Sequence, residues 1–283
     1  MTTTTVPSIA GAPYATGTVA RLRWAVADSV TVTLRNLIAY TRIPEQLFFS
    51  SVQPIMFVLL FVYVFGGAIH PQGGIAYVNY LMPGIFVQTM AFGAVSTSIG
   101  LAEDLQKGLI ERFRALPMAR SAVLAGRTSA DLVRNVFVGI IITLVGLAVG
   151  FRIINGFAAF LAGFALVLLF AYALSWGFAV IGLSAPNSET AQVMSFPILF
   201  PLTFCSSAFV PVATMPSWLQ GFATYQPVSV VINATRALML GPKAAILFGH
   251  APTSTLVLRA LAWCVVLLVV LAPLAVRRYR NRT

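Results

Sequence analysis

The chain has 283 residues, of which 59% are hydrophobic and only 9% are charged, whereas soluble globular domains carry about 25% charged residues. Its mean hydropathy is +0.90 and its formal net charge is +11. The composition excludes a soluble enzyme, a disordered chain and a disulfide scaffold, and it predicts an all-α integral membrane protein that binds no nucleic acid.

The N-terminal part divides into two segments before the first long apolar run. Residues 1–18 are rich in Thr, Ala and Pro, so we expect them to be disordered, and they show no cleavable signal sequence. Residues 19–45 predict an amphipathic helix, which lies either in the cytoplasmic interface of the bilayer or on the protein's own cytoplasmic face. Its apolar stripe is Val19, Leu22, Val26, Val30, Leu34 and Leu37.

Residues 46–276 form the predicted transmembrane domain, because long stretches in it lack Asp, Glu, Lys and Arg. A membrane helix needs about 20 mostly apolar residues, and Gly and Pro divide the longest stretch. Pro197 and Pro201 should kink or partly unwind the fifth span. The hydroxyls of Ser195, Thr203, Ser206 and Ser207 then either satisfy the freed carbonyls or face a pathway. The six predicted spans are about 48–66, 80–101, 132–150, 157–183, 191–209 and 255–276.

Between the second and third spans, residues 103–119 predict a cytoplasmic helix. Glu103 and Lys107 form a favourable i,i+4 pair, and Pro117 ends the segment. An apolar stripe beside charges of both signs favours docking on another protein, although a solvated face that covers the bundle is the alternative. The stripe consists of Leu101, Leu105, Leu109, Phe113 and Leu116.

Residues 210–240 predict two short re-entrant helices in the outer leaflet. Three prolines divide the segment, so it does not resemble a further span. Trp218 and Tyr225 are typical of the membrane interface. Backbone of this kind must be covered by protein or face a water-filled cavity.

The basic residues set the predicted topology. Fourteen of the 18 Lys and Arg fall in the N-terminal segment, in the loop after the second span and in the basic tail 277–283. Because cytoplasmic segments retain Lys and Arg, both termini should be cytoplasmic. Sixteen of the 18 are Arg, which is typical of a GC-rich bacterial genome and indicates a bacterial plasma membrane. The four on the outer side are Arg152, Arg236, Lys243 and Arg259.

Several short motifs occur in a characteristic order along the chain. They are Gln53-Pro54, Phe65-Gly66-Gly67, Tyr80-Leu81-Met82-Pro83-Gly84, Glu103 to Arg127 with Asp131, Ser206-Ser207-Ala208-Phe209-Val210-Pro211, Met215-Pro216-Ser217-Trp218-Leu219 and Gln226-Pro227-Val228. In this order and spacing the sequence resembles the type-2 ABC exporter permeases, and most of all their daunorubicin-resistance branch.

The resemblance implies a six-span permease half that assembles with a second half, identical or a sister chain, and with separate ATPase subunits that bind ATP and Mg. It implies that residues 103–116 and the loop at 187–189 couple to the ATPase. Independently, Asn187 or Ser188 should cap the fifth span, with Glu189 in its first turn. The coupling residues so implied are Glu103, Asp104, Lys107, Gly108, Glu111, Arg112, Phe113, Arg114, Leu116, Asn187 and Glu189.

The same resemblance implies that the second and fifth spans line the transport pathway. No catalytic, metal or cofactor site is expected on this chain. The expected pathway residues are Gln88, Thr89, Phe92, Ser96, Phe200, Phe204 and Ser206.

The expected function is the permease subunit of an ATP-driven exporter of amphipathic drug-like or lipid-like compounds. The sequence has no G-x-x-x-x-G-K-[ST] motif, so ATP hydrolysis is expected on a partner chain and the protein is not an enzyme. Lipid or polysaccharide export is an alternative, and a continuous aromatic belt along the pathway would favour polysaccharide. A secondary transporter coupled to ions is another, disfavoured because no ionisable residue lies in the middle of a predicted span.

Overall fold

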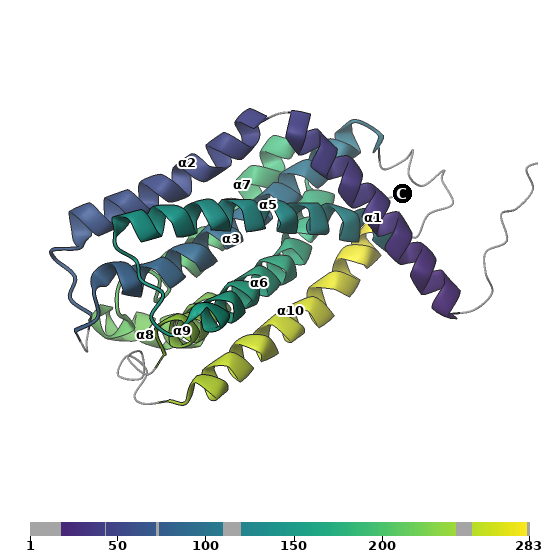
Figure 1. Ribbon diagram of the computed structural model, residues 1–283. Coiled ribbons are helices and arrows are strands. Elements are labelled where there is room, and N and C mark those ends of the chain that lie inside the picture. The colour runs from purple at the N-terminus through teal and green to yellow at the C-terminus, as the bar shows by residue number, and fades with distance from the viewer. Residues whose placement is uncertain (1–17, 43, 72–73, 110–119, 242–250, 282–283) are drawn as a thin grey trace, which may run out of the picture.

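The computed structural model describes residues 18–42, 44–71, 74–109, 120–241 and 251–281, and within these ranges the chain forms helices and no strand. The predicted all-α class is confirmed. Four of the described helices are long and apolar enough to cross a membrane, and Figure 1 shows them running lengthwise through the bundle. They are α3 (Tyr77–Gln106), α5 (Arg120–Val149), α6 (Phe157–Ser184) and α10 (Thr253–Asn281).

Shorter helices complete the described part of the chain. The predicted first span is α2 (Pro44–Leu60) followed by a π-helical turn (Phe61–Phe65), and the predicted fifth span is α7 (Ser188–Phe204). Neither reaches the length of the four long helices. The predicted pair of short helices over 210–240 is present as α8 (Ser217–Tyr225) and α9 (Pro227–Leu240), after a 3-10 turn (Val212–Thr214).

Helix α3 lies at the centre of the bundle, with most of its side chains buried. It packs along α6 and also contacts α5, α7 and α9. Two glycines permit its closest contacts. A Cβ on Gly182 of α6 would collide with the Ser98 carbonyl, and one on Gly84 of α3 would collide with the backbone of Ala208. Because glycine lets two backbones approach, α3 is held tightly both to α6 and to the segment that follows α7.

Helix α10 is peripheral. It packs on α6 and α9, but only 17% of its most apolar stretch is buried. Leu258, Val265 and Val269 are more than half exposed. A continuous apolar face of this size is stable only against lipid or another apolar surface.

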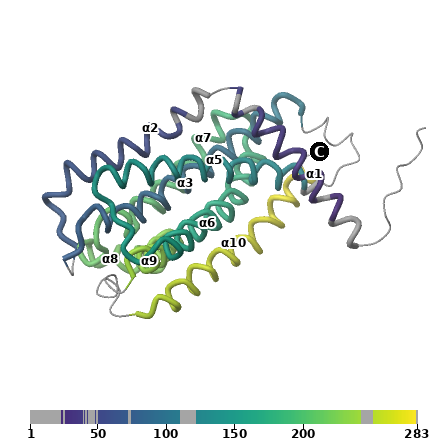
Figure 2. The backbone as a smooth tube through the Cα atoms, in the orientation of Figure 1, coloured from purple at the N-terminus to yellow at the C-terminus, as the bar shows by residue number. Residues whose placement is uncertain are grey.

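Helix α1 (Thr18–Arg42) crosses one end of the bundle (Figure 2). Its Val32 and Tyr40 are buried on the side that packs against α5. The predicted stripe lies elsewhere, because Val26, Val30 and Leu34 are exposed. The helix therefore has two apolar faces: one packs on the protein itself, and the other is exposed and free for the bilayer. The two alternatives for this segment, packing on the protein and lying in the membrane interface, each describe one of these faces. Residues 1–17 and the side chains of Val19 and Leu22 lie outside the described part.

Helix α7 stays helical through Pro197 and Pro201, so the predicted partial unwinding is wrong. Ser195, Thr203 and Ser206 are fully buried, and each donates a hydrogen bond to a backbone carbonyl three or four residues earlier. The acceptors are the carbonyls of Ala191, Leu199 and Thr203, whereas the two prolines free those of Val193 and Pro197. The hydroxyls therefore bond to the backbone, but not to the carbonyls that the prolines free.

The single helix expected over 103–119 is interrupted. Glu103 to Gln106 are the last turn of α3, and a turn at Lys107 and Gly108 follows, with a φ of +64° at Gly108. The apolar spacing predicted continuity because one glycine costs a helix only about 1 kcal/mol. A glycine in the left-handed conformation instead ends a helix. Residues 110–119 lie outside the described ranges.

Candidate functional site

A polar cleft lies between α2, α3, α5 and α7, with a volume of about 210 Å³. Glutamine, serine and threonine side chains form one part of its wall, and phenylalanines form another. Four of the predicted pathway residues lie in this wall: Gln88, Thr89, Phe92 and Ser96. The other lining residues are Ser50, Gln53, Pro54, Phe57, Gly93, Val95, Ile99, Arg134, Asn135, Val138, Gln192 and Phe196.

Arg134 supplies the charge of the cleft. Its side chain is 7% exposed, and its Nη1 and Nη2 donate to Ser96 Oγ at 2.7 Å and to the Gly93 carbonyl at 2.8 Å. Its Nε is buried and has no hydrogen-bond partner among the described residues. No carboxylate is found among the described residues that line the cleft. A ligand that brings a hydrogen-bond acceptor would therefore be favoured over one that brings a positive charge.

A row of phenylalanines connects the cleft with the far end of α2. Phe92 meets Phe200 edge to face, with ring centroids 5.8 Å apart, and Phe200 stacks on Phe204 at 5.3 Å. Phe204 then meets Phe57 at 6.5 Å, and Phe57 stacks on Phe61 at 5.9 Å. Phe200 and Phe204 are 45% and 39% exposed, so they offer free ring faces beside the cleft. Such faces suit flat apolar compounds.

Three predicted pathway residues do not line the cleft: Phe200 and Phe204 lie beside it, and Ser206 is buried away from it. It is fully buried, and its hydroxyl donates to the Thr203 carbonyl at 2.5 Å. The prediction placed it there because the fifth span was expected to continue to residue 209. Helix α7 ends at Phe204, and the chain turns away after it.

A second polar group, the charged cluster, joins α1, α3 and α5 where α1 crosses the bundle. Its centre is Asp131, which is 1% exposed. The carboxylate of Asp131 accepts hydrogen bonds from Tyr40 Oη and Thr97 Oγ1, both at 2.5 Å, and lies 3.8 Å from Arg127 Nε. Burial, and next the Asp131 charge, raise the pKa of Tyr40 to about 12.

Asp104 extends the charged cluster to the end of α3. Its carboxylate lies 3.6 Å from Arg35 of α1 and 4.0 Å from Arg127 of α5. The predicted coupling residue Asp104 thus binds its own chain. Glu103 and Lys107 are exposed and pair with each other. The predicted coupling residues outside the described ranges are Glu111, Arg112, Phe113, Arg114 and Leu116.

The loop before α7 has the predicted geometry. Asn187 accepts a hydrogen bond from the backbone N–H of Thr190 at 2.7 Å and caps the helix, and Glu189 lies in the first turn. Asn187, rather than Ser188, is therefore the cap. A contact of this loop with another chain stays a prediction.

No ionisable residue lies in the middle of a predicted span, but the structure buries three charged side chains at the edge of a span or outside the spans. Asp131, Arg134 and Arg236 are all at least nine-tenths buried. Arg134 reaches the Gly93 carbonyl near the middle of α3, since a long side chain carries its charge far from its own Cα. The spacing of Arg127, Asp131 and Arg134, four and three residues, indicates one helix face and was the signal available in the sequence.

The sequence is similar to one protein family and to several individual proteins. Residues 29–240 match the family described as ABC-2 type transporter. The chain is 34% identical to the daunorubicin resistance ABC transporter permease protein DrrB1 of Streptomyces coeruleorubidus, over 91% of this chain and 88% of the relative. It is 26% identical to the probable doxorubicin resistance ABC transporter permease protein DrrC of Mycobacterium tuberculosis, over the whole of both chains. With the inner membrane transport permease YadH of Escherichia coli it shares 25% identity, over 68% of this chain and 76% of the relative.

Proposed function

Because the chain belongs to the ABC-2 type transporter family, we propose that it exports amphipathic drug-like or lipid-like compounds, driven by ATP hydrolysis on a separate subunit. The observation that carries the choice of cargo is the polar cleft, which combines apolar ring faces with one buried cation and no carboxylate. A flat molecule with carbonyl oxygens would stack on Phe92 and Phe200 and accept hydrogen bonds from Arg134.

The proposal gives the permease six spans, with α2 and its π-turn as the first and α7 as the fifth. Both helices are short, but apolar residues on each of them are exposed. Such residues are suited to contact lipid or a second permease half. Met56 and Leu60 on α2 and Val193 and Ile198 on α7 support such a second half. We place both termini in the cytoplasm of a bacterial cell, in agreement with the distribution of Lys and Arg.

Coupling to the ATPase is proposed at the end of α3 and at the loop before α7. The exposed pair Glu103–Lys107 and the turn at Gly108 support this, because they lie beside the charged cluster. A displacement of this turn by the ATPase would be transmitted to α1 and α5 through the contacts of Asp104 with Arg35 and Arg127. ATP and Mg would bind to the partner subunit.

The test is transport into inverted vesicles that contain this chain and the ATPase that co-purifies with it. The probe is a fluorescent planar aromatic ketone, compared with an amine of the same ring system. We expect accumulation to need ATP, and Phe200→Ala to lower it about fivefold, the equivalent of one aromatic contact. Arg134→Gln should shift the preference toward the amine. Val269→Ala, on the exposed face of α10, is the control.

Two outcomes would replace the proposal. Accumulation driven by an ion gradient, with no ATPase present, would indicate the secondary transporter, for which buried Asp131 is a candidate. Transport of a lipid-linked glycan in place of the ketone would indicate polysaccharide export. The row of phenylalanines is the continuous belt that favours this alternative, although its rings carry no hydroxyl for sugar groups.

A further inference from the structure

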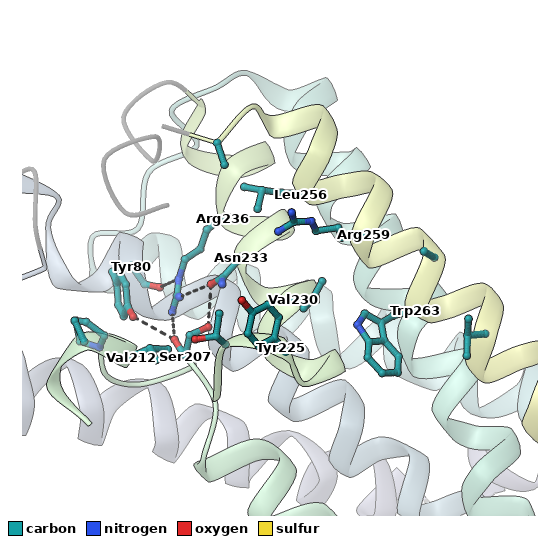
Figure 3. A pocket seen from close by; sticks show the side chains of 16 residues that line it. Tyr80, Ser207, Val212, Tyr225, Val230, Asn233, Arg236, Leu256, Arg259 and Trp263 are labelled. Atoms are coloured by element: carbon teal, nitrogen blue, oxygen red, sulfur yellow. Dashed lines mark hydrogen bonds between the residues drawn. The ribbon is translucent and has the colours of Figure 1, made fainter. Parts of the chain in front are cut away.

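A second cavity, which we call the α9–α10 pocket, has a volume of about 730 Å³ (Figure 3). Its walls come from the first turn of α3, the segment after α7, the end of α8, and the facing sides of α9 and α10. It shares no lining residue with the polar cleft. Its volume lies in the range of sites for small organic ligands, about 300–1,000 Å³. None of the predicted site residues lies in it.

Arg236 of α9 forms the inner wall of the α9–α10 pocket and is 1% exposed. Its Nε donates to the Tyr80 carbonyl at 2.8 Å, and its guanidinium carbon lies 3.7 Å from the centre of the Tyr80 ring. Its Nη2 donates to the carbonyls of Ser207 and Ala208. Its Nη1 has one long contact, 3.4 Å, with Asn233 Oδ1. All these partners are neutral, so the positive charge stays uncancelled.

The chain offers no acid to cancel it. Residues 46–102 and 190–283 contain neither Asp nor Glu, and these stretches supply every wall of the pocket. A second cation, Arg259 of α10, is exposed and also lines the pocket, on the side opposite Arg236 (Figure 3). Two arginines around one opening, with no carboxylate, attract an anion.

The remaining walls are apolar and lead out of the pocket. Trp263 and Val266 of α10 line it, and they are 36% and 51% exposed. Val270, one turn further on, is 57% exposed. Tyr225 at the rim is 73% exposed, as is usual for aromatic residues at the level of lipid headgroups. The pocket therefore joins a positive end to an apolar track along α10.

We propose that the α9–α10 pocket binds an anionic phospholipid taken from the surrounding bilayer. The phosphate lies between Arg259 and the Arg236–Asn233 side, where the positive charges converge. One acyl chain follows Trp263 and Val266 along the exposed face of α10. A zwitterionic lipid fits the track equally well but adds no net negative charge, so the anionic lipid is preferred.

The experiment measures lipid retained by the chain together with its ATPase subunit, using native mass spectrometry from micelles that contain equal amounts of phosphatidylglycerol and phosphatidylcholine. We expect phosphatidylglycerol to be retained preferentially. Arg259→Gln should lower its retention about fivefold, the effect of one basic residue near a lipid surface. Ala262→Phe, which fills the pocket without changing charge, should lower retention of both lipids.

Arg152→Gln is the matched control, because Arg152 is an exposed arginine of the same end that does not line the pocket. Among the described residues, its side chain bonds to the carbonyls of Leu147 and Phe151. Equal retention of the two lipids would overturn the inference, as would equal losses in Arg259→Gln and Arg152→Gln. Displacement of the lipid by inorganic phosphate alone would also overturn it, since the acyl track would then contribute nothing. ATP-driven uptake of the ketone is recorded on the same samples, so failure of lipid binding is distinguishable from failure of the proposed transport.

Discussion

Toward the end crossed by α1, the carboxylates of Asp131 and Asp104 lie beside arginines of α1 and α5. Toward the other end, Arg236 is just as deeply buried but is held by carbonyl oxygens and a tyrosine ring. At this first end, acids of the same chain offset part of the positive charge. The other, acid-free end has no Asp or Glu among its described residues, so the stability of buried Arg236 depends on the geometry of its hydrogen bonds to carbonyl oxygens.

We expect the two ends to lie on opposite sides of the membrane, which cysteine labelling tests with an all-or-none result. Gly67→Cys, at a position with open space around it, should react with an impermeant maleimide added to intact cells. Lys107→Cys, on the exposed turn after α3, should react only after the cells are opened. The reverse pattern would invert the topology.

The largest expected change in stability is that of Asp131→Asn. It leaves Arg127 with only the longer contact to Asp104 among the described residues and weakens the hydrogen bonds from Tyr40 and Thr97. Because hydrogen bonds to a buried charged group contribute more than neutral ones, we expect a loss of about 3 kcal/mol. Thermal unfolding in detergent measures it. If the loss of stability were no larger than that for substitution of an exposed acid, charge pairing would not distinguish this end from the acid-free end.

Arg236→Lys probes the acid-free end with the charge retained. Lysine lacks the planar fork that reaches Tyr80, Ser207 and Ala208 together, so we expect a loss of about 2 kcal/mol. Arg152→Lys, at an exposed site of the same end, should change stability by less than about 0.5 kcal/mol. If both variants behave alike, charge alone holds this end and the geometry is irrelevant.

Asp104→Asn should have the smallest effect. Its two arginine contacts are 3.6 and 4.0 Å long, and loose, partly exposed pairs contribute about 1 kcal/mol or less. We expect the variant to reduce the rate of transport more than the free energy of unfolding, because Asp104 connects α3 with α1 and α5. The test is therefore the ratio of ATP hydrolysed to compound accumulated. An unchanged ratio would limit coupling to the segment beyond Gly108.

Sequence patterns predicted the apolar helices well and the charged ones poorly. The predicted span 157–183 corresponds to α6 at Phe157–Ser184, because nearly every position there is apolar. The predicted span 132–150 misses the first three turns of α5, which begins at Arg120. Those turns carry Arg127 and Asp131, which bind Asp104 of α3 and Tyr40 of α1, and a search for apolar residues excludes them.

The candidate site shows the same limit. Gln88, Thr89, Phe92 and Ser96, which the family resemblance nominated, lie together on the side of α3 that lines the cleft, and their role in a pathway stays a prediction. Arg134 was missed. Its role depends on which neighbouring helix its side chain reaches, and that is a property of packing between distant segments rather than of local sequence.

Helix α7 is attached near both of its ends. Ala191 is buried with Ala102 of α3 near the start, and the Gln226 side chain donates to the Leu202 carbonyl near the finish at 2.8 Å. With 17 residues and a rise of about 1.5 Å each, the rod is about 25 Å long. A tilt of about 10° at the α3 attachment would carry the far tip about 4 Å, together with the Gln226 side chain that is bonded to it. A small rotation beside the Gly108 turn would thus be enlarged into a displacement wide enough to admit or expel an aromatic ring.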